Sequence, residues 1–197
     1  MSEPETRTIE SFIQPPSSQK TYFGHPIGLF VLFFTEMWER FSYYGMRALL
    51  VLYMVKHLLL TAEQGTTIFG YGAVKMFLVS LFGPLATQAM SSQIYGLYTG
   101  FVYFTPVFGG IIADKLLGQR KTVYLGGVLM AIGQFMLMAP SLFFVGLFFL
   151  VLGNGCFKPN ITTQVASLYP PGDPRRDGAY TVFYMGVNLG AFLAPLI

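Results

Sequence analysis

The chain has 197 residues, of which 53% are hydrophobic and 11% charged, and its mean hydropathy is +0.55. In a typical soluble domain roughly a quarter of the residues are charged, so the composition argues against a soluble domain. A disordered chain has few aromatic residues and a high charge, so that class is excluded as well. The single cysteine excludes a disulfide scaffold. A net charge of +3 without a basic stripe also argues against nucleic-acid binding, so the composition predicts an integral membrane protein.

The beginning of the sequence is polar and lacks the apolar core of a cleaved signal peptide. Residues 1–21 are expected to form a polar cytoplasmic tail, and residues 22–197 a partial transmembrane bundle. A helix needs about 20 mostly apolar residues to cross a bilayer core. The apolar runs predict five such spans, at about residues 26–55, 94–113, 122–139, 142–165 and 178–197.

The first predicted span, residues 26–55, contains an unusual group of charges. Glu36, Glu39, Arg40 and Arg47 stand between apolar flanks, although a charge at the bilayer centre costs roughly 2.5–3.5 kcal/mol. At about 100° per residue, Arg40 and Arg47 lie within about 40° of Glu36. One face of this helix is therefore polar.

Ion pairing would lower the cost of these charges. Glu36 and Arg40 are four residues apart in the orientation that favours an ion pair, and Tyr43 and Tyr44 follow closely. One interpretation is that the polar groups only hold helices together. A single pair would suffice for that, so the sequence favours a functional site, which ionisable groups inside a membrane usually mark.

Between the first two spans lies a lateral or interfacial segment at about residues 66–90. The uncharged stretch at residues 76–89 is too short to cross the bilayer and suits a segment that lies along it. The polar residues 91–93 then separate this segment from the second span, residues 94–113.

The fourth span contains a second buried cation, Lys158, about two-thirds of the way along residues 142–165. The next residue, Pro159, cannot donate a backbone hydrogen bond. One interpretation is a lysine that reaches the inner membrane surface. Several residues follow before the next loop, however, so we expect the ammonium group to face the same cavity as Glu36 and Glu39. A carboxylate beside an ammonium group could act as a proton switch.

The third, fourth and fifth predicted spans are separated by a turn and a loop, and several spans contain glycine pairs. A tight turn at residues 139–141 separates the third and fourth spans, and a proline-rich loop occupies residues 166–176. Asn188 is expected to be a third buried polar group, in the last span. Three pairs of glycines are suited to close helix packing, Gly96 with Gly100, Gly153 with Gly155 and Gly186 with Gly190.

Lysine and arginine are concentrated on one side of the predicted bundle. With the N-terminus inside, the inner segments carry most of these residues, as the positive-inside rule requires. A sixth span at residues 66–90 would weaken the bias, so five spans are favoured. The inner residues are Arg7, Lys20, Lys115, Arg120, Lys121, Arg175 and Arg176, and the outer ones are Lys56 and Lys75.

Three motifs stand in order on different predicted spans, EMWERFSYYGMR at residues 36–47, KPN at 158–160 and FYMGVNLG at 183–190. Together they resemble the proton-dependent oligopeptide transporter family of the major facilitator superfamily. The resemblance covers about residues 22–197. It implies an all-α membrane protein, the N-terminal helical bundle of a major facilitator superfamily fold, with about five transmembrane helices. The apolar stretch at residues 191–197 leads us to expect a truncated piece of a longer protein.

The resemblance also implies roles for individual residues and partners. Small peptides would be the substrate, protons the coupling ion without other cofactors, the lipid bilayer the surroundings, and the C-terminal half of the transporter the missing partner. Proton coupling would involve Glu36, Glu39, Arg40 and Lys158. Peptide binding would involve Tyr43, Tyr44, Arg47, Tyr103, Lys158 and Asn188, with Arg47 and Lys158 holding the peptide carboxylate.

The expected function is proton-coupled symport of di- and tripeptides across the cell inner (plasma) membrane by alternating access, within a longer transporter. The alternative is a truncated membrane fragment without transport activity of its own, because five helices cannot form two rocking halves. An enzyme is not expected, since Cys156, His25 and His57 fall on different segments without a nucleophile–base pair. No metal-ligand spacing is present either.

Overall fold

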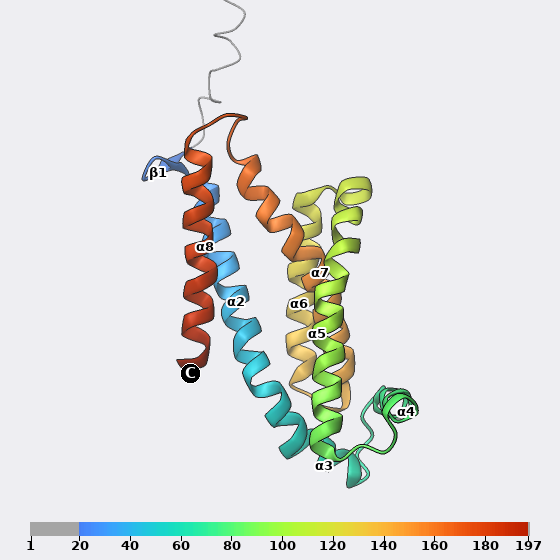
Figure 1. Cartoon of the computed structure of the whole chain (residues 1–197). Helices are drawn as coiled ribbons and strands as arrows, with labels where there is room; N and C mark the ends of the chain where they lie inside the picture. The colour runs from blue at the N-terminus through green and yellow to red at the C-terminus, as the bar shows by residue number, and fades with distance from the viewer. Residues whose placement is uncertain (1–19, 197) are drawn as a thin grey trace, which may run out of the picture.

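Residues 20–196 are described by a computed structural model, in which most of them are helical (Figure 1). The predicted tail at residues 1–21 falls almost wholly outside this range. A short antiparallel hairpin comes first, with strands β1 (Thr21–Tyr22) and β2 (His25–Pro26). The helices are α2 (Ile27–Tyr53), α3 (Leu59–Glu63), α4 (Tyr71–Phe82), α5 (Thr87–Ile112), α6 (Gln119–Leu137), α7 (Phe143–Ser167) and α8 (Arg175–Leu193).

Short irregular helical turns continue four of these elements. Two are π-helical, at Met54–Leu58 after α2 and at Ala113–Leu117 after α5. The other two are 3-10 turns, at Pro140–Leu142 before α7 and at Ala194–Leu196 after α8.

Four helical stretches in the described part of the chain are long and apolar enough to cross a membrane. They coincide with four of the five predicted spans. The remaining prediction, residues 122–139, coincides with α6, a helix of 19 residues whose first turn carries Arg120 and Lys121. The four stretches are Ile27–Glu63, Thr87–Leu117, Pro140–Ser167 and Arg175–Leu196.

The outside of the bundle is apolar. Large side chains such as Phe34, Leu49, Phe101 and Phe135 are more than half exposed. Exposing so much apolar surface to water would be unfavourable. The chain is therefore an integral membrane protein whose helices present these side chains to lipid or to other helices.

The second spanning helix begins earlier than its hydropathy suggests. Helix α5 starts at Thr87, although residues 91–93 are polar. The hydroxyl of Ser91 donates to the carbonyl of Thr87 at 2.9 Å, and that of Ser92 to the carbonyl of Gln88 at 3.0 Å. These polar groups are satisfied within the helix itself, so they do not interrupt it.

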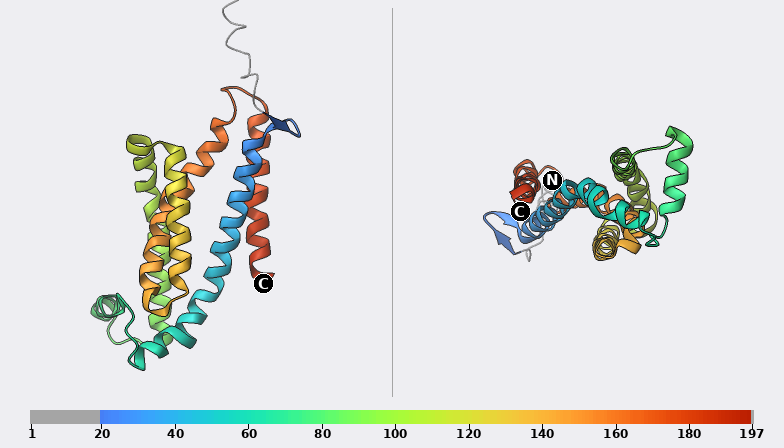
Figure 2. Two further views of the ribbon diagram at one scale, coloured as in Figure 1. Left: turned by 180° about the vertical axis from the view of Figure 1, so that it is seen from behind. Right: turned by 90° about the horizontal axis from the view of Figure 1, so that it is seen from below.

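The helices form two groups. Helix α8 lies along α2, while α5 and α6 both pack against α7 (Figures 1 and 2). Between α2 and α8, a Cβ atom added to Gly186 would lie 2.8 Å from the carbonyl oxygen of Phe33, and Gly190 packs against the backbone of Met37. The close packing predicted for Gly186 and Gly190 is confirmed.

Glycines also set the contacts of α7. A Cβ atom added to Gly133 of α6 would lie 2.8 Å from the carbonyl oxygen of Gly146, and one added to Gly153 would lie 2.6 Å from Met130. On the α5 side, Gly155 would meet Thr105 at 2.7 Å. The prediction that Gly153 and Gly155 admit close neighbours is confirmed. At Gly96 and Gly100, by contrast, an added Cβ atom would meet nothing within 4 Å.

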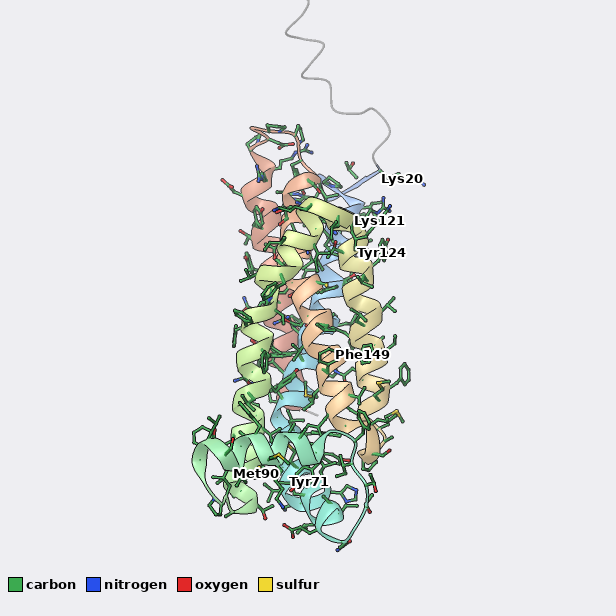
Figure 3. The ribbon with its side chains drawn as sticks, turned by 90° about the vertical axis from the view of Figure 1, so that its right-hand side faces the viewer. Lys20, Tyr71, Met90, Lys121, Tyr124 and Phe149 are labelled. Carbon is green, nitrogen blue, oxygen red and sulfur yellow. The ribbon has the colours of Figure 1, made fainter. Side chains whose placement is uncertain are left out.

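Helix α4 lies across the long axis of the bundle, at the end where α3 is found (Figure 1). It is bounded by Gly70 and Gly83, which have φ values of +82° and +76°, a backbone conformation that favours glycine and ends the helix. Lys20 and Lys121 lie at the opposite end from Tyr71 (Figure 3). That α4 lies on the outer membrane surface, and that the basic end is cytoplasmic, remain predictions.

Candidate functional site

One arginine on α2 is shared between two carboxylates. Glu36 and Arg40 are each only 5% exposed. The Nε atom of Arg40 lies 3.1 Å from Oε1 of Glu36, one helical turn away, and it also donates to Oε2 of Glu39. The predicted ion pair between Glu36 and Arg40 is therefore present, and Glu39 joins it.

The charged cluster leaves several polar atoms available. The guanidinium of Arg40 stacks 5.2 Å from the centre of the Tyr43 ring, which is itself buried. Within residues 20–196, Oε2 of Glu36, Nη2 of Arg40 and the hydroxyl of Tyr43 are buried without a hydrogen-bond partner. Buried polar atoms of this kind are unfavourable unless water or another group bonds them. The cluster can therefore accept a proton, a water molecule or a substrate group.

A residue of α7 completes the surroundings of Glu39. Asn154, which is 4% exposed, donates from Nδ2 to Oε1 of Glu39 at 3.3 Å. This contact connects the charged face of α2 with the α5–α7 group of helices. Glu39 and Asn154 both line a partly open cavity of about 300 Å³ between α2, α5, α6 and α7.

The second arginine of α2, Arg47, lies beside a tyrosine of α5. Its Nε atom donates to the hydroxyl of Tyr95, and its guanidinium lies 5.4 Å from the centre of the Tyr95 ring. Arg47 is partly exposed. Its remaining N–H groups are therefore within reach of an anion beside the bundle.

Lys158 is partly exposed and lies against α5 rather than against the acids of α2. Its Nζ atom lies 5.1 Å from the centre of the Tyr103 ring, a cation–π contact. In the described range it forms no ion pair with Glu36 or Glu39 within 4.0 Å. The structure brings Lys158 and Tyr103 together, and the pairing of Lys158 with the acids remains a prediction.

Three of the predicted site residues, Tyr44, Tyr103 and Asn188, are exposed. Tyr44 is exposed and contacts the ring of Tyr43 at 5.3 Å. Asn188 is exposed, not buried as we expected. The side of α8 that faces α2 is taken by Gly186 and Gly190, and Asn188 lies off that side.

Two contacts of the site were missed in the sequence analysis. Tyr95 contacts Arg47 across 48 residues of sequence, and no local pattern joins the two. Asn154 lies four residues before Lys158, on the same face of α7. That spacing could have revealed Asn154 beside the second cation.

The described residues contain no group of three or more histidine, cysteine or acidic side chains that could hold a metal ion. The site is instead a set of fixed charges and hydroxyl groups. Groups of this kind can exchange protons, form ion pairs and form hydrogen bonds.

An apolar helical bundle with charged side chains buried on one helix defines an integral membrane protein with an ionisable site in its interior. The POT family model matches residues 120–197. Relatives include the peptide transporter YePEPT of Yersinia enterocolitica, 43% identical over 90% of this chain and 32% of its own length. A di-/tripeptide transporter of Lactococcus lactis is 44% identical over 91% of this chain and 33% of its own length.

Solved structures agree with the sequence matches. The crystal structure of a peptide transporter POT in complex with sulfate has a TM-score of 0.73 and 42% identity, covering 91% of this chain and 33% of that one. Over residues 120–197 the chain matches the POT family, and its described helices are similar to the N-terminal helical bundle of POT peptide transporters, which have the major facilitator superfamily fold. It spans about a third of the length of the relatives that it matches.

Proposed function

We propose that this chain is part of a proton-coupled symporter that carries di- and tripeptides across the cell inner (plasma) membrane, with its N-terminus in the cytoplasm. The names of its relatives as peptide and di-/tripeptide transporters support the substrate class. The basic residues at one end of the bundle support the orientation.

The observation that carries the proposal is Arg40 held between Glu36 and Glu39 at 5% exposure. One guanidinium cannot neutralise two carboxylates, so the buried cluster favours uptake of one proton. A proton gained or lost there changes the charge of the cluster and with it the ion pairs of Arg40 with Glu36 and Glu39. Such a change is the coupling step that a proton-driven carrier needs.

Binding of the peptide would rest on the two other cations. Arg47 and Lys158 each lie against a tyrosine ring of α5, Tyr95 and Tyr103. A peptide has a carboxylate at one end, and an arginine fork and an ammonium group are suited to hold it. A site that recognises the peptide backbone would accept many side chains. Tyr43, Tyr44 and Asn188 are proposed as further peptide contacts.

The chain alone is proposed not to transport. Alternating access requires two helical halves that rock around a central site, and this chain spans about a third of its relatives. A fragment that only associates with other helices is therefore the second candidate function.

Uptake of a labelled dipeptide tests the proposal. Liposomes containing the complete transporter should accumulate the dipeptide when the outside is acidic, and free di- and tripeptides should compete with it. Accumulation that ignores the pH gradient would reject proton coupling. Competition by amino acids but not by peptides would reject the substrate class.

A further inference from the structure

Asn154 is a buried polar residue whose contact with Glu39 no motif of the sequence explains. It lies on α7 between Gly153 and Gly155, where α7 makes its closest contacts with α6 and α5. Close packing on both sides fixes the position of the Asn154 backbone. Its side chain therefore reaches Glu39 from a rigid part of the bundle.

Within residues 20–196, Asn154 supplies the hydrogen bond that Glu39 receives from another helix. Arg40, the other partner of Glu39, is its neighbour in the sequence and moves with α2. Lys158, one turn further along α7, lies over Tyr103. Asn154 is thus the side chain by which α7 holds the carboxyl group of Glu39.

The chemistry of an amide suits a partner that changes its protonation state. A carboxylate only accepts hydrogen bonds, whereas a carboxylic acid also donates one. Asn154 now donates through Nδ2, and its Oδ1 atom is buried without a partner in the described part of the chain. A half-turn of the amide would present Oδ1 as an acceptor for a protonated Glu39. An ammonium group has no acceptor and could not do the same.

We infer that Asn154 is a positioning residue that holds the carboxyl group of Glu39 against α7 in both of its protonation states. The inference rests on the proposed function of Glu39 as a proton carrier. Asn154 would keep α2 and α7 together at this point while the charge of Glu39 changes.

The test is infrared difference spectroscopy of the complete transporter during a pH titration. Glu39→Gln identifies the carboxyl band of Glu39. In Asn154→Leu, the leucine side chain has a shape similar to that of asparagine but lacks both of its hydrogen-bonding groups. Asn160→Leu is the matched control, because Asn160 is on the same helix, is 3% exposed, and donates to backbone carbonyls of Cys156 and Gly109 instead.

Asn154→Leu should shift the frequency of the Glu39 carboxyl band, because the protonated carboxyl group then has no acceptor on α7. Asn160→Leu should leave the frequency of this band unchanged. An unchanged band in Asn154→Leu, or an equal change in both variants, would overturn the inference. If Asn154→Leu does not fold, Asn154→Ala decides by the same band, because alanine also lacks both hydrogen-bonding groups.

Peptide uptake gives a second readout. Asn154→Leu should lower proton-driven uptake about tenfold, the loss expected for one hydrogen bond to a charged group. In Asn160→Leu, uptake should fall only in proportion to the amount of folded protein. Equal losses of uptake per folded protein in Asn154→Leu and Asn160→Leu would contradict the positioning role of Asn154. If the wild-type transporter shows no proton-driven uptake, the proposed function fails, while the infrared result still decides on Asn154.

Discussion

At the scale of single residues, the polar groups of α2 are arranged in two layers. Arg40 is enclosed with Glu36 and Glu39 inside the bundle, whereas Arg47 is partly exposed and lies against α5 through Tyr95. The enclosed layer suits the exchange of a proton. The partly exposed layer suits the binding of an anion.

Replacing Arg47 with alanine should weaken binding of peptides with a free carboxylate by about tenfold or more, because a charge-assisted hydrogen bond is lost. Binding of peptides with an amidated C-terminus should weaken much less. Competition assays with the free and amidated forms of one dipeptide measure the difference. Equal losses for both forms would remove Arg47 from the carboxylate site.

Replacing Lys158 with glutamine should abolish accumulation of peptide against its gradient, because the ammonium group of α7 can no longer respond to the charge on α2. Exchange of labelled for unlabelled peptide should be reduced less, since exchange needs no net proton movement. Both rates are measured in the same liposomes. Undiminished acid-driven accumulation by Lys158→Gln would contradict this role.

The sequence predicted the part of the site that depends on helical spacing alone. The pairing of Glu36 with Arg40 follows from their separation of four residues. The contact of Asn154 with Glu39 and that of Tyr95 with Arg47 depend on how α7 and α5 pack against α2. Spacing along one helix carries no information about those distances.

At the scale of helices, α6 and α7 are held together by glycines facing glycines. At Gly133, an added Cβ atom would lie 2.8 Å from the carbonyl oxygen of Gly146, too close for any side chain. Backbones can approach each other in this way only when both helices lack side chains at the contact. No sequence pattern indicated Gly133 and Gly146, because their contact depends on the turn between the two helices and not on a fixed spacing along one helix.

Gly133→Ala should therefore destabilise the bundle by about 1–3 kcal/mol, the range for overpacking a well-packed contact. Gly127→Ala is the control on the same helix, because an added Cβ atom there would meet nothing within 4 Å. Thermal unfolding in detergent compares the two variants. Equal unfolding temperatures would contradict the close contact of α6 with α7.

A polar contact joins the hairpin to the loop before α8. Arg175 binds both oxygens of Asp173 and donates to the carbonyl of Gly24 at 2.9 Å, and His25 is hydrogen-bonded to Tyr169 at 2.8 Å. The side-chain hydrogen bonds from Arg175 lower the pKa of Asp173 from 3.8 to about 2. The contact fixes the start of α2 beside the start of α8.

Because the pKa of Asp173 is lower in the folded state, its stabilising effect is present above about pH 4 and is lost as the pH falls towards 2. The wild type should therefore unfold at a higher temperature than Asp173→Asn above about pH 4, and the gap should close at lower pH. Asp177→Asn, which lacks such a pair in the described residues, is the control. A gap that persists unchanged near pH 2 would contradict the pairing.

At the scale of the whole molecule, the apolar runs were sufficient to predict the main helices and their order. The polar residues 91–93 misled the prediction of where α5 begins, because serine hydroxyls can bond within a helix. The division into an α2–α8 pair and an α5–α7 group (Figure 2) could not be predicted, since it depends on contacts between helices that are distant in the sequence.

The orientation of the bundle can be tested by cysteine labelling, with the buried Cys156 replaced by alanine. Cysteines at positions 120 and 176 should react with a membrane-impermeant reagent only from the cytoplasmic side, because the basic ends of helices stay inside. A cysteine in place of Lys75 on α4 should react from the outside. Labelling of position 120 from the outside would reverse the proposed topology.

The most direct test of proton coupling at the α2 cluster is the internal pH of liposomes that contain the complete transporter and a pH-sensitive dye. Without an imposed gradient, adding a dipeptide outside should acidify the interior for the wild type, because each peptide enters with protons. Glu39→Gln should bind the dipeptide without acidifying the interior. Equal acidification by the wild type and Glu39→Gln would contradict the account.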